Sequence, residues 1–169
     1  MSALSAIPWA TQEVVAAILD RPNACIHLIG IGGAGLSAIA MILLERGYRV
    51  SGSDLVRTPM TDRLEVAGAT IHIGQAAGQA RGADLVLVSS AVRPENPELQ
   101  SALAVGIPVV KRAQFLGALM RGRIGIAVAG THGKTTTTAM IATTLLAAGY
   151  DPDFIVGGTV PGLECNARA

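Results

Sequence analysis

The sequence predicts an α/β protein in which a Rossmann-like parallel sheet is followed by the start of a second α/β ATPase domain, made of a strand, a P-loop and a helix. Three observations predict this fold class. Short apolar runs alternate with helix-like segments, as in chains built from βαβ units. A glycine-rich turn at residues 30–35 follows the first apolar run, and a second glycine turn at residues 130–136 follows a later one.

The first elements form a βαβ unit behind a short helix. Thr11 is placed to cap a helix over residues 12–19. The apolar run 25–29 is the first predicted strand, residues 36–46 form a helix that ends at a glycine, and residues 48–52 form the second strand. Two strands joined by one helix are expected to pair in parallel.

The alternation continues to residue 120, with helices predicted at 60–67, 96–105 and 112–120 and strands at 69–73, 83–88 and 107–110. A polar connection, Arg121-Gly122-Arg123, marks the boundary between a first domain (1–122) and a second domain (123–169).

The second domain is expected to be incomplete. Residues 124–128 are predicted to be a buried strand, 137–146 a helix and 154–156 a strand, followed by a loose tail over 162–169. The chain is therefore expected to be an N-terminal fragment of a longer protein. Apolar edges left open in residues 123–169 predict mobility or self-association there.

Composition limits the classes of partner. The chain has 13 basic and 12 acidic residues and a net charge of +1, which gives no electrostatic basis for binding nucleic acid. No apolar run approaches the ~20 residues of a membrane helix, and no basic leader precedes an apolar block. Cys25 and Cys165 lie far apart without metal-ligand spacing, as expected of two reduced thiols. A cytoplasmic protein without membrane insertion is the expectation.

The turn at residues 130–136 has the layout of an ATP-binding phosphate loop. Its glycines let the backbone approach phosphates closely, and the following helix adds a positive N-terminal end. Lys134 supplies a cation for the outer phosphates, and the Thr135 hydroxyl is placed to bind Mg²⁺. The general pattern would have a glycine where the chain has Val128. The alternative is an ordinary turn at the start of a helix.

The turn at residues 30–35 matches the dinucleotide pattern Gly-x-Gly-x-x-Gly between a strand and a helix. Asp54, at the end of the second strand, is placed to bind a ribose or a base. Ser89 and Ser90 end another strand, and the carboxyl ends of parallel strands share one edge of the sheet. The spacing fits NAD(H) or any other nucleotide that carries a diphosphate.

Three motifs resemble those of the Mur ligases, which build the peptide stem of bacterial cell-wall precursors. The motifs are the loop 130–136, the loop 30–37 taken with Ser51-Gly52-Ser53-Asp54, and the stretch 89–98. The resemblance covers residues 26–158. Within the family, the loop 30–35 favours the branch that adds L-alanine over the branch that recycles murein tripeptide.

The resemblance implies which residues bind each nucleotide. The first domain would hold the UDP part of UDP-N-acetylmuramate through Gly30, Gly32, Gly33, Ala34, Gly35, Asp54, Ser89 and Ser90. The second domain would hold ATP through Gly130, Thr131, His132, Gly133, Lys134, Thr135 and Thr136. Lys134 and Thr135 would be catalytic, with Thr135 also a Mg²⁺ ligand.

The implied reaction is ATP-dependent ligation of L-alanine to UDP-N-acetylmuramate. The muramyl carboxylate attacks the γ-phosphorus, and the amine of L-alanine attacks the resulting acyl phosphate. This chain is expected to bind the UDP-sugar without catalysing ligation alone. The alternatives are a non-catalytic nucleotide-binding module and, less favoured, an NAD-binding oxidoreductase domain, which would leave residues 130–136 unexplained.

Several side chains lie outside these motifs or depart from the family pattern. Gln75 stands where the family often has histidine, and Gln114 where an acidic residue is common. His27 and His72 are expected to be structural, while His132 either contacts a ligand or contributes only its backbone. Arg93 and Lys111 are expected to be solvated charges.

Overall fold

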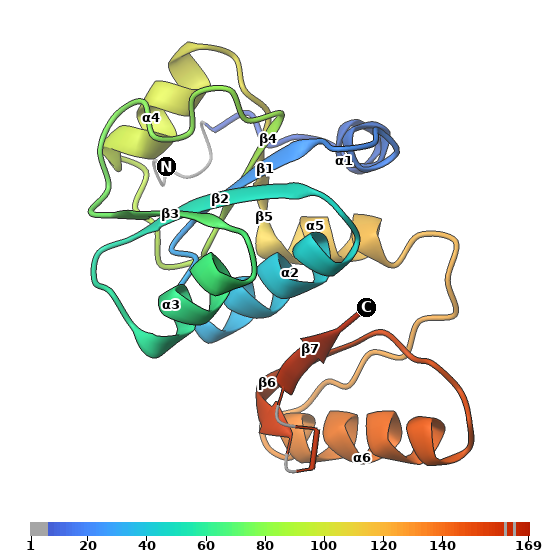
Figure 1. Cartoon of the computed structure of the whole chain (residues 1–169). Coiled ribbons are helices and arrows are strands. Elements are labelled where there is room, and N and C mark those ends of the chain that lie inside the picture. Colours follow the sequence, from blue (N-terminus) through green and yellow to red (C-terminus); the bar gives the residue numbers. More distant parts are fainter. Residues whose placement is uncertain (1–6, 161, 164) are drawn as a thin grey trace.

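The computed structural model describes residues 7–160, 162–163 and 165–169. Its main element is a five-stranded sheet of strand order β3-β2-β1-β4-β5 (Figure 1). The strands are β1 (Cys25–Ile29), β2 (Arg49–Asp54), β3 (Thr70–Ile73), β4 (Leu85–Val88) and β5 (Val109–Lys111). All neighbouring strands pair in parallel, which confirms the predicted fold class. The strand order reverses between β1 and β4, and this switch point is where open α/β sheets bind ligands.

Helices cover both faces of the sheet. They are α1 (Gln12–Leu19), α2 (Ala34–Glu45), α3 (Pro59–Val66), α4 (Pro97–Ala104) and α5 (Arg112–Leu119). Figure 1 shows α4 on one face and α2, α3 and α5 on the other, with α1 beside α5. The five strands and five helices agree with the predicted positions to within a few residues at each end.

The core forms because alternate residues of the central strands point to opposite faces. Ile26 and Leu28 of β1 are fully buried and pack toward α2, while Ile29 packs toward α4. All four residues of β4 are buried, as expected of a strand covered on both sides. The larger core cluster lies on the α2 face, and a smaller one lies beneath α4.

His27 is the polar exception on β1. It is fully buried, with Nε2 2.5 Å from Oε1 of Glu98 and Nδ1 2.8 Å from Oγ of Ser51. The prediction of a structural, hydrogen-bonded histidine is confirmed. His72 is half-buried on β3, its ring centroid 6.4 Å from that of His27.

The start of β4 is tied to the start of β1 by a charged residue. Oδ2 of Asp84 accepts the N–H of Cys25 at 2.8 Å, and Oδ1 pairs with the Arg21 guanidinium at 2.7 Å. The backbone bond and the ion pair hold the pKa of Asp84 below its usual range. Asp84 therefore stabilises the amino-terminal end of the sheet, opposite to the end where ligands bind.

Residues beyond 122 form a separate, smaller structure. The helix α6 (Lys134–Ala147) packs on an antiparallel ribbon of β6 (Phe154–Val160) and β7 (Cys165–Arg168). Its core consists of Ala142, Phe154, Val156 and Val160 with a few partly buried neighbours.

Two predictions for this region were wrong. Residues 124–128 are not a strand: they run without strand pairing to any described residue, and Ile124 is 100% exposed. An apolar run becomes a strand only where a neighbour accepts its hydrogen bonds. The tail is not loose, because residues 165–168 form β7, which pairs with β6 and packs against α2. The resulting burial of Ala167 gives the tail a fixed place.

One carboxylate joins the two parts of the chain. Oδ2 of Asp153 accepts from Nη2 of Arg46 at the end of α2 and from Nη1 of Arg123 in the connection, each at 2.5 Å. The backbone N–H of Ala169 donates to Oε2 of Glu45 at 2.6 Å.

Among the described helices, none is both long and apolar enough to cross a membrane.

Candidate functional site

The glycine loop at residues 30–35 is held in place by the end of β2. The backbone N–H groups of Gly30 and Ile31 both donate to the carbonyl oxygen of Ser53, at 2.8 and 3.0 Å. Gly30 has a φ of +85°, which lets the chain turn sharply as it leaves β1. The loop therefore sits at the carboxyl edge of the sheet, beside the switch point.

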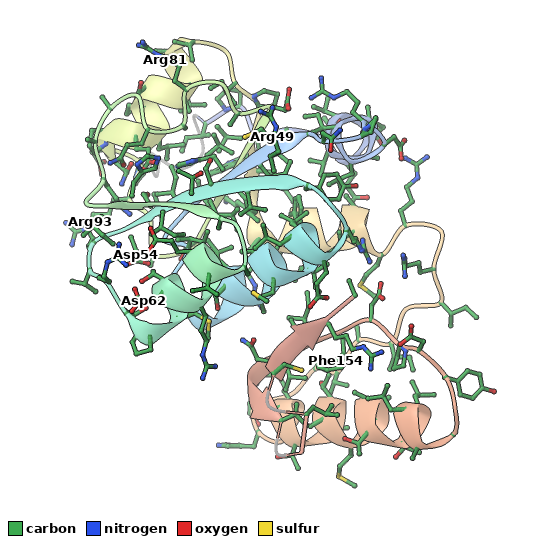
Figure 2. All side chains as sticks on the ribbon, in the orientation of Figure 1. Arg49, Asp54, Asp62, Arg81, Arg93 and Phe154 are labelled. Atoms are coloured by element: carbon green, nitrogen blue, oxygen red, sulfur yellow. The ribbon has the colours of Figure 1, made fainter. Side chains whose placement is uncertain are left out.

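Asp54 braces the same loop through its side chain. Oδ2 of Asp54 accepts the N–H of Gly32 at 2.8 Å, and a Cβ added at Gly32 would lie only 2.9 Å from that oxygen. The sequence predicted Asp54 as a ligand-binding residue. The structure adds a second role, because one carboxylate oxygen fixes the middle glycine of the loop. Figure 2 shows Asp54 and the exposed Arg93 at the same end of the sheet.

The loop leads directly into the N-terminus of α2. Gly33 is the N-cap residue, and since glycine has no side chain, the N–H groups of Ala34 and Gly35 remain available to a ligand, while those of Leu36 and Ser37 donate to the carbonyl oxygen of Gly33. Gly33 and Ala34 are exposed. The helix begins at Ala34, two residues earlier than predicted, so Ala34 and Gly35 present helical N–H groups. Such an end favours an anion.

Ser89 lies against the loop from the other side of the switch point. Its N–H donates to the carbonyl oxygen of Ile29 at 3.3 Å, and a Cβ added at Gly30 would meet the Cβ of Ser89 at 3.3 Å. Its Oγ accepts the N–H of Ala91 at 3.2 Å, so the hydroxyl shapes its own turn. Ser90 follows and is exposed. The predicted loop, Asp54 and the Ser89–Ser90 turn are thus brought to one edge.

Arg112 is a site residue that the sequence reading missed. It follows β5 directly and starts α5, and its guanidinium lies over Gly35, where an added Cβ would be 2.7 Å from Cζ. A cation therefore faces the first turn of α2. In the sequence, Arg112 is a basic residue directly after a predicted strand, and the carboxyl end of that strand lies at the ligand-binding edge. This position was the signal that could have indicated it. Its neighbour Lys111, predicted as a solvated charge, is exposed, and its Nζ also lies 4.6 Å from the centroid of the Trp9 ring.

The two departures from the family pattern have structural partners. Oε1 of Gln75 accepts from Nδ2 of Asn96 at 2.6 Å, which ties the loop after β3 to the cap of α4. Oε1 of Gln114 accepts the N–H of Lys111 at 3.4 Å, at the start of α5. Both glutamines therefore support the local fold at the ligand-binding edge.

The second loop, residues 130–136, is exposed throughout. Gly130 and Gly133 have φ values of +150° and +79°, which favour glycine. Nζ of Lys134 donates to the carbonyl oxygens of Gly130 and Thr131 at 2.6 and 3.2 Å, so the ammonium group folds back over its own loop. Gly133 caps α6, a helix of 14 residues. This geometry fits a phosphate loop.

Thr135 faces β6. A Cβ added at Gly157 would meet Oγ1 of Thr135 at 3.1 Å, so the glycine lets the strand approach the hydroxyl closely. In the described ranges, no cluster of three or more His, Cys, Asp or Glu side chains is arranged to bind a metal.

A parallel sheet with a braced glycine loop at its switch point, followed by a second glycine loop at a helix start, is the arrangement typical of nucleotide-binding α/β proteins. The comparison with protein families makes the class specific. Residues 25–124 match the description "Mur ligase family, catalytic domain". The chain belongs to the Mur ligase family.

Two curated relatives at 54% identity carry the same name. The chain is 54% identical over 143 residues to the UDP-N-acetylmuramate--L-alanine ligase of Laribacter hongkongensis and 54% identical over 143 residues to that of Burkholderia cenocepacia. Each alignment covers 85% of this chain, but only 30% and 31% of the relatives. The chain therefore spans about a third of the length of the ligases that it matches.

Solved structures give the same fold in two branches of the family. The UDP-N-acetylmuramate-alanine ligase of Thermotoga maritima has a TM-score of 0.79 and 36% identity, covering 84% of this chain and 34% of that one. The UDP-N-acetylmuramate:L-alanyl-gamma-D-glutamyl-meso-diaminopimelate ligase of Neisseria meningitides has a TM-score of 0.81 and 34% identity, covering 86% and 46%. The backbone does not separate the branches.

Proposed function

We propose that this chain is the nucleotide-binding part of a ligase that adds L-alanine to UDP-N-acetylmuramate in peptidoglycan precursor synthesis. The observation that carries the proposal is the glycine loop, held by Ser53 and Asp54 at the N-terminus of α2. Its amides suit a diphosphate, and the relatives with 54% identity bear that ligase's name.

In this proposal, residues 1–122 are the UDP-sugar-binding domain. The N–H groups of Ala34 and Gly35, at the start of α2, hold the diphosphate, and Arg112 adds a positive charge beside it. Asp54 retains one carboxylate oxygen for the nucleoside, and the turn at Ser89 and Ser90 closes the pocket from the β4 side. The uncharged loop amides position the diphosphate, while Arg112 offsets its charge.

Residues 123–169 contribute the ATP loop of the central domain. Lys134 neutralises charge that grows on the β- and γ-phosphate oxygens during transfer, and this requires the ammonium group to leave its present carbonyl partners. Mg²⁺ would be held by the Thr135 hydroxyl, and the bound ion would polarise the transferred phosphoryl group. His132 stays a predicted contact of the loop.

The reaction proposed for the whole ligase has two steps. A carboxylate oxygen of the muramyl group attacks the γ-phosphorus of ATP, which releases ADP and leaves an acyl phosphate. The amine of L-alanine then attacks the acyl carbon, loses a proton and expels inorganic phosphate. We expect this chain, at about a third of the ligase length, to bind the UDP-sugar without forming the amide.

Calorimetric titration tests the proposal directly. The chain is titrated in turn with UDP-N-acetylmuramate, NAD⁺ and Mg·ATP. Binding of the UDP-sugar with a 1:1 stoichiometry is expected. Binding of NAD⁺ without binding of the UDP-sugar would overturn the assignment and favour an oxidoreductase domain instead. UDP and UDP-N-acetylglucosamine serve as controls for the contribution of the lactyl carboxylate.

A further inference from the structure

A buried polar network lies beneath α4, on the face of the sheet opposite to α2. It joins His27 of β1, Ser51 and Ser53 of β2, and Glu98 of α4. Oε1 of Glu98 is 2.5 Å from Nε2 of His27, and Oε2 accepts the hydroxyl of Ser53 at 2.5 Å. Nδ1 of His27 lies 2.8 Å from Oγ of Ser51. His27, Ser53 and Glu98 are each 0% exposed.

Stability alone does not account for this network. Its surroundings are apolar, with Ile29, Val86 and Leu99 forming the core beneath α4. Removing a carboxylate from water is costly, and well-packed apolar residues often replace buried charged groups without loss of stability. In some proteins, buried polar groups of this kind fix a unique geometry.

Ser53 connects the network to the glycine loop. Its hydroxyl donates to Glu98, and its carbonyl oxygen accepts the N–H groups of both Gly30 and Ile31. The next residue, Asp54, holds the N–H of Gly32. The residue that α4 fixes through its side chain is therefore the one that shapes the loop through its backbone.

We propose that Glu98 is a positioning residue for the glycine loop. By fixing Ser53, it holds the glycine loop, and with it the free N–H groups of Ala34 and Gly35, in the arrangement that receives the diphosphate, before any ligand arrives. The proposal rests on the proposed function of this loop. A loop that is already ordered loses less conformational freedom on binding, so the network raises nucleotide affinity without touching the nucleotide.

The helix that carries Glu98 also anchors the loop after β4, on the other side of the switch point. Oδ1 of Asn96 accepts the N–H groups of Glu98 and Leu99 at 3.0 and 2.9 Å, which caps α4. Asn96 closes the loop that begins at Ser89, and its N–H donates to the carbonyl oxygen of Arg93 at 3.1 Å. Glu98 therefore fixes the end of β2 relative to the loop after β4, the two segments that flank the diphosphate.

Two serines of the same network provide a matched pair for the test. Ser51→Ala and Ser53→Ala each remove one hydroxyl from β2, and each removes one hydrogen bond of the network. Only Ser53 holds the glycine loop through its carbonyl oxygen. We expect Ser53→Ala to raise the hydrogen-exchange rates of the Gly30 and Ile31 amides about tenfold and to weaken UDP-N-acetylmuramate binding about tenfold. Ser51→Ala should change neither by more than about twofold.

Variants of Glu98 separate positioning from packing. Glu98→Gln keeps an oxygen that accepts from the Ser53 hydroxyl and supplies an N–H that donates to a His27 ring nitrogen. It should keep the exchange rates of the loop amides within about threefold of those of the parent chain. Glu98→Leu keeps the side-chain volume but removes the hydrogen-bond acceptors for Ser53 and His27. It should raise the exchange rates of the Gly30 and Ile31 amides as much as Ser53→Ala does. The proposal would be overturned if Ser51→Ala and Ser53→Ala raised the exchange rates of the loop amides equally. It would also be overturned if these amides exchanged in Glu98→Leu as slowly as in the parent chain.

The exchange measurement is made on the ligand-free chain, so it decides the positioning role even if the UDP-sugar does not bind. Absence of UDP-sugar binding by the unsubstituted chain would count against the proposed function only. Selective loosening of Gly30 and Ile31 in Ser53→Ala would still support positioning by Glu98. The two proposals therefore fail separately.

Discussion

Oδ2 of Asp54 lies 2.8 Å from the backbone nitrogen of Gly32, so the carboxylate that ends β2 holds the central glycine of the glycine loop. A hydrogen bond from an amide to a carboxylate is stronger than one between neutral groups. We expect Asp54→Ala to weaken binding of the UDP-sugar about tenfold, while Asp54→Asn, which keeps an oxygen acceptor, loses less. Calorimetry measures both, and equal affinity of all three chains would contradict this role.

Gly33 allows the anion site to be tested without unfolding the protein. Its φ of −69° and ψ of 142° suit any residue, and it occupies the N-cap of α2. Gly33→Asp should maintain or raise the melting temperature, because aspartate is a preferred N-cap, yet reduce UDP-sugar affinity at least tenfold by placing a negative charge where the diphosphate belongs. Gly33→Ser is the uncharged control. An unchanged affinity for Gly33→Asp would remove the diphosphate from this helix end.

Arg112 is predicted to act through its charge. Replacing it with alanine should weaken binding of the UDP-sugar about five- to tenfold and make the affinity less sensitive to salt, because one favourable charge interaction is lost. Arg112→Lys should retain part of the effect. Arg93→Ala, at an exposed position on the same end of the sheet, is the matched control (Figure 2). If both alanine variants behaved alike, a specific role for Arg112 would be rejected.

Asp84 gives a prediction about pH and stability. Its pKa is held below the usual value of about 3.9 in the folded chain, so its contribution is present above that value and is lost as the pH falls through the folded pKa. Asp84→Asn should therefore lower the free energy of unfolding by about 0.5 kcal/mol at pH 7. The difference from the parent chain should shrink below pH 4. Urea unfolding at pH 7, 5 and 3 measures it, and a constant difference would contradict the assignment.

The unpaired segment 124–128 is predicted to be the least protected part of the second unit. Ile124 and Ile126 are 100% and 59% exposed, and none of the amides of this segment takes part in a described strand. Their hydrogen exchange should approach that of a free chain, while amides of β6 exchange more slowly. Ile124→Lys should reduce any concentration-dependent association seen by sedimentation. Strong protection throughout residues 124–156 in a monomer would contradict both expectations.

The parallel sheet was predictable because its signals are local. Each strand of the first unit is a short apolar run, and glycine or an N-cap residue marks the ends of most helices. The glycine loop, Asp54 and Ser89 follow strands whose carboxyl ends meet, so their proximity follows from topology alone. The fold brings these residues to one edge of the sheet, and the ligands that they bind stay a prediction.

The missed features depend on contacts between distant parts of the chain. The apolar run 124–128 has the composition of a strand, but pairing depends on a partner that composition does not reveal. The tail has no strand pattern of its own in the sequence, because β7 is stabilised by its pairing with β6 and its contacts with α2. Arg112 and Glu98 lie far along the chain from the loop that they support, so only the folded arrangement shows their relation to it.

The hydrogen bonds that hold residues 30–32 of the glycine loop to β2 all go to Ser53 and Asp54, the last two residues of that strand. The geometry of the loop therefore depends on the register between β1 and β2. Ile29 is aligned with Ser53, which is why the turn that follows Ile29 meets the carbonyl oxygen of Ser53 and the side chain of Asp54. A slip of one residue would send each β2 side chain to the opposite face and remove Glu98's partner. If the proposed site binds nucleotide, only molecules with β1 and β2 in the native register would bind it, and purification on an immobilised nucleotide would select correctly folded molecules.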